Sequence, residues 1–166
     1  MSSTFSASEA YGAGPTVVDP TTAINLLASD AASGSDTTTV PNANPIAIPG
    51  AGTAYSYERW LRGKWTGVGT SITSITVCHH TVSPPTGVTL YGGCKTNASY
   101  VQSVNTVSSY ATNNISTADT TFADGSSLGS GTVQSFYEVL QLRVASTCVT
   151  PGNLGNLTIR FGWNEI

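Results

Sequence analysis

The sequence predicts an all-β fold, a β-sandwich or jelly-roll-like antiparallel domain that follows an extended N-terminal arm. Charged residues make up only 9% of the 166 residues, while Thr and Ser number 25 and 21, so hydroxyl groups must supply much of the polar surface. The helix formers Lys, Glu and Leu are scarce, whereas Thr, Val, Ile, Tyr and Trp recur, as is typical of strands. Short alternating segments about ten residues apart predict six to eight strands in one domain.

Residues 1–50 are expected to form the arm and residues 51–166 the domain. Five Pro residues between positions 15 and 49 prevent a long regular element. Residues 21–29 allow a short helical turn or an anchor for a partner's groove, and a loop laid over the chain's own domain is an equally good interpretation. The candidate partner-binding residues of the arm are Phe5, Ile24, Leu26, Leu27 and Ile46.

Alternation begins at Tyr55, where Tyr57, Leu61 and Trp65 face one way in a half-buried strand. Trp60 breaks this phase and is therefore the candidate aromatic anchor at an interface. The neighbouring aromatic residues fit either a core face or a platform for sugar, and the core is favoured.

The next two expected strands, 72–79 and 88–91, would continue the first as a meander around a Pro-rich turn. Weaker alternation between positions 100 and 131 predicts short or edge strands. Regular alternation returns in 136–146 and in 157–163, and the latter is expected to be a central closing strand.

The sequence offers little catalytic chemistry. Residues 125–129 match the pattern G-x-S-x-G, but no His follows them and the segment is typical of a turn. The nine carboxylates form no evident pair. A net charge of −3 with only two Lys and four Arg gives no basic stripe for nucleic acid, and no apolar run is long enough for a membrane span. No export signal is recognisable at the N-terminus. We therefore expect no catalytic residue, no cofactor and no membrane or nucleic-acid partner.

Cys78, His79 and His80 are adjacent potential metal ligands. Neighbours on a strand point to opposite faces, so at most two of them can reach one ion, and a four-ligand site is not encoded in one chain. Cys78 and Cys94 are expected on neighbouring antiparallel strands, where a disulfide and two free thiols are equally good interpretations, with Cys148 left over.

Three segments resemble a family of small tailed-phage virion proteins, the capsid decoration or cement proteins. They are Ser56-Tyr57-Glu58-Arg59-Trp60-Leu61-Arg62-Gly63-Lys64-Trp65-Thr66-Gly67, Tyr137 to Val144, and Leu157-Thr158-Ile159-Arg160-Phe161-Gly162-Trp163-Asn164-Glu165-Ile166. The opening Phe5-Ser6-Ala7-Ser8-Glu9 and the segment Asn44-Pro45-Ile46 are similar in character. Together these segments cover about half of the chain.

The resemblance implies a β-sandwich on the capsid exterior, a homotrimer assembled in the host cytoplasm, with N-terminal arms that clamp the major capsid protein. A Pro-rich, weakly charged arm suits this role because it can become ordered on binding. Three alternatives stay open: a carbohydrate- or receptor-binding module of a phage fibre or tail, a hydrolase on a jelly roll, and a pilus or surface-layer subunit.

Overall fold

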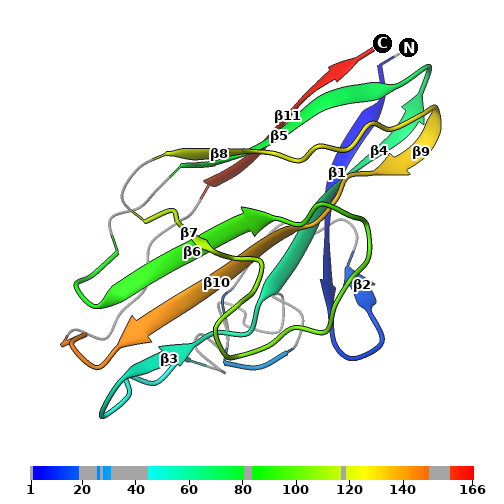
Figure 1. The fold of residues 1–166 in the computed structure, drawn as a ribbon. Coiled ribbons are helices and arrows are strands. Elements are labelled where there is room, and N and C mark those ends of the chain that lie inside the picture. The colour runs from blue at the N-terminus through cyan, green and yellow to red at the C-terminus, as the bar shows by residue number, and fades with distance from the viewer. Residues whose placement is uncertain are drawn as a thin grey trace, which may run out of the picture.

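The computed structural model describes residues 2–18, 26, 28–30, 45–80, 84–116, 119–149 and 158–166. Across these residues the chain is all-β and its strand pairs are antiparallel, which confirms the all-β, antiparallel part of the prediction. None of the described segments forms a helix that could cross a membrane. Two sheets pack against each other, as Figure 1 shows.

The larger sheet has eight strands in the order β2-β1-β4-β10-β6-β7, with β3 paired to β10 and β9 paired to β4. Its strands are β1 (Thr4–Tyr11), β2 (Thr16–Val18), β3 (Thr53–Tyr55), β4 (Arg59–Val68), β6 (Val88–Cys94), β7 (Asn113–Asn114), β9 (Gly131–Gln134) and β10 (Glu138–Ala145). The smaller sheet has the order β11-β5-β8. Its strands are β5 (Ile72–His80), β8 (Thr120–Ala123) and β11 (Thr158–Glu165).

The main apolar core lies between the two sheets. Leu61 on β4 and Leu140 on β10 contribute to it from the larger sheet, and Phe122 and Ile159 pack against it from the smaller sheet. Side chains alternate along each strand, so the register assigns every second residue of β1, β4, β6 and β10 to this inner face. The remaining residues form what is called below the outer face of the larger sheet.

Strand β4 differs from the half-buried strand that the sequence predicts. Its first three residues, Arg59 to Leu61, are all buried, because the strand lies between β1 and β10 and both of its faces are covered. Trp60 therefore keeps the strand phase and simply points to the other, equally buried face.

The described part of residues 1–50 does not form a separate arm. Seven residues of β1, Thr4 to Ala10, pair with β4, and β2 pairs with the end of β1. Leu26 and Ile46 pack against the core between the sheets, which matches the interpretation of a segment laid over its own domain. The other arm positions, 19–25, 27 and 31–44, lie outside the described residues.

The expected meander is wrong, because β5 leaves the sheet that holds β4 and β6 and joins the smaller one. Cys78 and Cys94 are thus on strands of different sheets, and all three cysteines are free thiols. The last strand, β11, has the predicted alternation but lies at an edge of its sheet. The short strands β7, β8 and β9 confirm the prediction for the middle of the chain.

The two ends of the chain lie together at one end of the molecule (Figure 1). The backbone N–H of Ser3 donates to Glu165 Oε1 at 3.0 Å, and the Ser3 hydroxyl donates to Glu165 Oε2 at 3.0 Å. Strands β1 and β11 also meet through side chains, since the ring of Phe5 stacks on that of Trp163 with 5.0 Å between centroids.

Candidate functional site

The outer face of the larger sheet carries the features best suited to binding. The loop 95–112 runs over this face and covers part of it, as the contacts of Tyr100 and Tyr110 with Trp60 show. Outward residues of β4 and β10, including Trp60 and Gln141, lie beneath the loop and are fully buried. The loop therefore presents the surface that a partner would meet at this position.

Trp60 is 0% exposed and cannot serve as the interface anchor that the sequence suggested. Its ring meets those of Tyr100, Tyr110 and Tyr137 edge-on at centroid distances of 5.3, 5.1 and 5.5 Å. Its indole N–H donates to Glu58 Oε2 at 3.1 Å, which satisfies the one polar atom of the ring. Trp60 is the centre of a second core that lies between the sheet and its loop.

Cationic side chains stack on the aromatic rings of this face. The Lys95 ammonium lies 5.3 Å from the Trp60 ring centroid and 5.2 Å from that of Tyr110. The Arg62 guanidinium lies 4.8 Å from the ring centroid of Tyr137. Ring faces attract cations, so these contacts hold the side chains against the domain. Arg143 makes a similar contact with Tyr91, so three of the chain's six Lys and Arg side chains are held in this way.

Gln141 fixes the loop to the sheet. Its side-chain N–H groups donate to Thr106 O at 2.7 Å and to Ser56 O at 3.2 Å, and its Oε1 accepts the backbone N–H of Ser108 at 3.1 Å. The amide is 0% exposed, so these bonds form away from water. A neutral amide with both donors and acceptors suits this position, because backbone groups of both kinds converge on it.

Replacing Gln141 with Ala should destabilise the domain by about 2 kcal/mol, since three backbone groups would lose a buried partner. Urea denaturation followed by circular dichroism measures this change, and hydrogen exchange should accelerate in residues 104–108. The variant Gln134→Ala, at a half-exposed position of β9, is the control and should change stability little. Unaltered exchange in the loop of Gln141→Ala would show that other contacts hold it.

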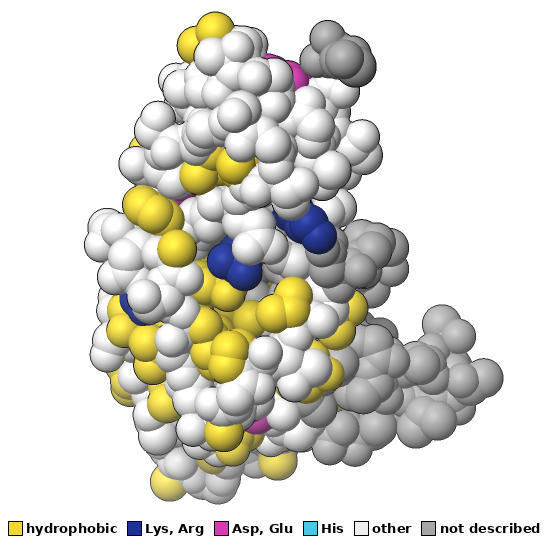
Figure 2. Space-filling view, turned by 90° about the vertical axis from the view of Figure 1, so that its right-hand side faces the viewer, with side chains coloured by type: hydrophobic (Ala, Val, Ile, Leu, Met, Phe, Trp, Pro, Cys, Tyr) yellow, Lys and Arg dark blue, Asp and Glu magenta, His cyan; other side chains and the backbone are white. Residues whose placement is uncertain are grey.

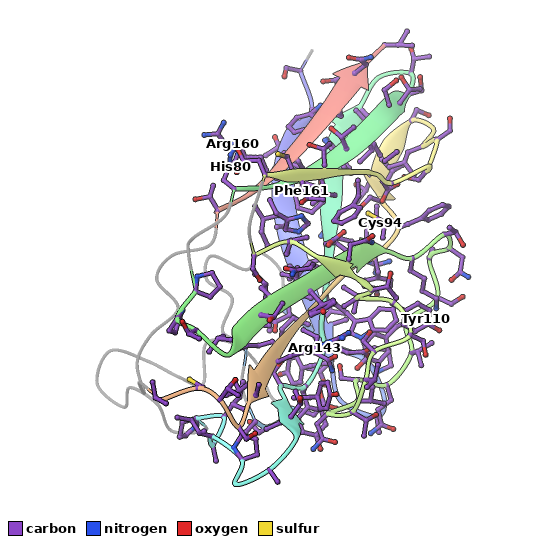
Figure 3. All side chains as sticks on the ribbon, turned by 60° about the vertical axis from the view of Figure 1, so that its left-hand side comes forward. His80, Cys94, Tyr110, Arg143, Arg160 and Phe161 are labelled. Atoms are coloured by element: carbon purple, nitrogen blue, oxygen red, sulfur yellow. The ribbon has the colours of Figure 1, made fainter. Side chains whose placement is uncertain are left out.

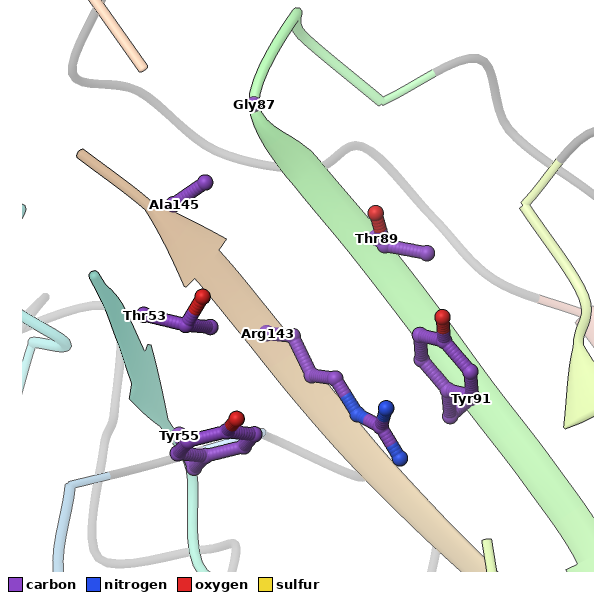
Figure 4. Close-up of a pocket in the computed structure, with 7 residues that line it drawn as sticks. All are labelled: Thr53, Tyr55, Gly87, Thr89, Tyr91, Arg143 and Ala145. Carbon is purple, nitrogen blue, oxygen red and sulfur yellow. The ribbon is translucent and has the colours of Figure 1, made fainter. Parts of the chain in front are cut away.

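A hollow of about 200 Å³ lies on the outer face beside β3, as Figure 4 shows. Arg143 lies across it, with its guanidinium 3.4 Å from the ring centroid of Tyr91 and 5.8 Å from that of Tyr55. One terminal nitrogen of Arg143 donates to Ala111 O at 3.1 Å. The hydroxyls of Thr53 and Thr89 also line the hollow. Hydroxyls, aromatic rings and a guanidinium together suit a sugar or a polar peptide group.

Exposed valines mark the loop itself. Val101, Val104 and Val107 are 42%, 39% and 59% exposed. Figure 2 shows hydrophobic side chains gathered over the lower half of one face, with Lys and Arg side chains beside them and few carboxylates. The backbone carbonyl of Val104 accepts the N–H of Glu58 at 3.1 Å, so this valine is presented by a loop that is fixed at its centre.

Several ionisable groups face inward instead. His79 Nε2 lies 3.1 Å from Glu138 Oε1, and the Cys94 thiol donates to Glu138 Oε2 at 2.9 Å. Burial raises the pKa of the Cys94 thiol, and the Glu138 carboxylate raises it further, so this thiol stays protonated. His79 and Glu138 are buried completely, which removes them from contact with a substrate in this conformation.

A second inward pair joins Glu9 of β1 to Arg59 of β4. Arg59 Nη1 lies 3.5 Å from Glu9 Oε1, and the two side chains are 0% and 1% exposed. Burial lowers the pKa of the Arg59 guanidinium, while the carboxylates of Glu9 and Asp30 oppose this shift. Arg59 also donates to Ser29 O at 3.2 Å, so the pair ties three separated segments together.

Three of the other residues predicted to bind a partner are described, and all three pack within the chain itself. The ring of Phe5 contacts Trp65, Phe161 and Trp163 and thus belongs to the chain's own packing. Leu26 and Ile46 pack on the core. Ile24 and Leu27 lie outside the described residues. None of the four described candidates, Trp60 included, forms a freely exposed anchor.

The residues 125–129, with the pattern of a catalytic serine, lie between β8 and β9. Ser126 is 6% exposed and its backbone N–H donates to Asp124 Oδ1 at 2.9 Å, while Leu128 bridges to Ile72. The Ser side chain thus takes part in a turn beside Asp124.

Gln141 and Arg143 are residues of this face that the sequence did not identify as candidates. Both lie on the face of β10 opposite Leu140 and Leu142, as strict alternation across residues 136–146 requires. Their roles depend on the loop 95–112, whose sequence has no strand periodicity that would have predicted where it lies.

No protein-family model, curated protein sequence or solved structure matches this chain.

Proposed function

We propose that this chain is a non-enzymatic structural protein of a tailed-phage virion, which decorates the capsid exterior and binds the major capsid protein. The fold proposed for it is a β-sandwich of the jelly-roll kind, assembled as a homotrimer in the host cytoplasm. The observation that carries the proposal is the loop 95–112, which holds three exposed valines and, after Lys95, no charged residue. The resemblance of the strand sequences to decoration proteins supports the choice of partner.

The physical properties of this surface suit a stable protein interface. Interface cores are depleted in charged residues, and residues 96–112 of the loop contain no charged side chain. Val101, Val104 and Val107 can bury apolar area on binding, while the neighbouring Ser and Thr hydroxyls can pair with backbone groups of a partner. Because Gln141 fixes the loop, little ordering of the loop would oppose binding.

Replacing Val101, Val104 and Val107 together with Ser should weaken binding to capsids that lack this protein by roughly 10- to 100-fold, as expected when apolar contacts are lost at an interface core. Cosedimentation with purified capsids measures the affinity. The control Val149→Ser changes a valine that is 82% exposed elsewhere and should leave binding unchanged. Equal binding of the triple variant and the native chain would contradict a role for this loop.

A second function is favoured by the hollow at Arg143. Its hydroxyls and its Tyr55 and Tyr91 rings suit a sugar, which corresponds to a carbohydrate- or receptor-binding module of a fibre or tail. Glycan binding that is lost in Thr89→Val and retained after the valine replacements would favour this alternative. A copy number in purified virions far below that of the capsid protein would favour it as well.

A further inference from the structure

The outward face of the smaller sheet carries a cluster of ionisable side chains that the proposed function does not use. Strand β5 is the central strand of this sheet, and His79 points inward while its neighbours Cys78 and His80 point outward and are partly exposed. Arg160 of β11 is the register partner of Cys78. Figure 3 shows His80 and Arg160 on this side of the molecule, away from Tyr110 and Arg143.

Cys78, His80 and Asp119, the residue before β8, form a chain of contacts. His80 Nδ1 lies 2.8 Å from Asp119 Oδ2, and His80 Nε2 lies 3.9 Å from Cys78 Sγ. A carboxylate accepts hydrogen bonds only, so Nδ1 is the donor to Asp119, and a ring that is protonated on Nδ1 alone presents its Nε2 lone pair to the thiol. Metal-binding histidines are commonly oriented in this way by a carboxylate on the second ring nitrogen.

The spacing of the two donors fits a zinc ion. Zn–S and Zn–N distances of about 2.3 and 2.0–2.1 Å at a tetrahedral angle place sulfur and nitrogen roughly 3.6 Å apart. The observed separation of 3.9 Å needs a shift of only a few tenths of an ångström.

We propose that Cys78 and His80 form half of a zinc site, which a second copy of this chain completes with its own Cys78 and His80. Structural zinc takes four ligands, and one chain provides two. The charges also balance, since two thiolates neutralise Zn²⁺ and the two Arg160 side chains offset the two Asp119 carboxylates. The register partners of Cys78 are Arg160 and Thr121, and that of His80 is Thr158, so two short hydroxyl side chains border the site.

Zinc titration of the reduced, metal-free full chain tests this proposal. We expect one zinc bound per two chains, release of the two Cys78 thiol protons per zinc, and a doubling of the molar mass of the metal-free species in light scattering. Cobalt(II) in place of zinc should give the absorption of a tetrahedral thiolate complex. Cys78→Ser and His80→Gln should each abolish binding, and Asp119→Asn should weaken it about 10- to 100-fold.

Cys148→Ser is the matched control, because it removes a buried thiol outside the site and should leave zinc binding intact. Circular dichroism of every variant establishes that it is folded. The proposal is overturned by the absence of saturable zinc binding, by one zinc per chain without a change in mass, or by binding that persists in folded Cys78→Ser. Rapid alkylation of Cys78 at saturating zinc would equally exclude it as a ligand.

Discussion

Deletion of residues 2–18 should leave a chain that no longer unfolds cooperatively. The deletion removes β1 and β2, and β1 pairs with β4 over seven residues. It also removes Glu9 and leaves the Arg59 guanidinium buried without this partner, which alone costs about 3–5 kcal/mol. Together with the lost packing of Phe5 and Ala10, this reaches the total stability of about 5–15 kcal/mol that is typical of a domain.

Thermal unfolding followed by circular dichroism distinguishes this outcome from that of a dispensable arm. The control is deletion of residues 2–3 alone, which removes the contacts of Ser3 with Glu165 at the surface and should cost about 1 kcal/mol or less. A fragment 19–166 with a sharp transition near that of the full chain would show that β1 is an accessory strand. The proposed role of the N-terminal region in capsid binding therefore cannot be tested by removing residues 1–50.

The elements that the sequence predicted well are those whose pattern is local. Along β10, Leu140, Leu142 and Val144 alternate with polar or outward residues, and all three are in the core between the sheets. Strand β11 likewise places Ile159 towards this core. Period-two alternation records which face of a strand is buried, but it does not record which strand lies next to it. The alternation therefore could not predict that β5 belongs to the smaller sheet.

Strand β1 was missed because Ala7 and Glu9, two of its inward residues, are small or charged. Ala7 lies opposite Gly63 of β4, where a side chain would meet the Trp65 ring at 2.5 Å, so little space is left between the strands and the core. Glu9 faces inward because Arg59 does. Each of these residues is compatible with burial only through a partner about 50 residues away, and no local pattern reveals such a pairing.

The candidate binding face shows the same limit. The outward phase of Trp60 was visible, and exposure was inferred because an outward aromatic residue on a half-exposed strand suggests an interface. The loop 95–112 removes that exposure, and it is held by contacts such as those of Gln141, which bind backbone atoms rather than particular side chains. Its valines became candidates only once the loop was seen to be fixed over the sheet.

The buried pair of Glu9 and Arg59 should show strong coupling in a double-mutant cycle. Arg59→Met keeps much of the side-chain volume but leaves the Glu9 carboxylate buried, and Glu9→Gln removes the carboxylate that lies 3.5 Å from the guanidinium. Removing one partner of a buried ion pair typically costs about 3–5 kcal/mol, because the remaining charge must be desolvated without compensation. We expect each single variant to lose stability in this range.

The double variant Glu9→Gln/Arg59→Met should be considerably more stable than the sum of the two losses predicts, since neither buried charge remains. Free energies of unfolding from urea denaturation give the coupling energy directly, and contacting residues show couplings of about 0.5–3 kcal/mol. The bond from Arg59 to Ser29 O is lost in both Arg59 variants and therefore cancels in the cycle. Additive losses would mean that Arg59 stabilises the domain through that bond and its packing, and that the charge on Glu9 is compensated elsewhere.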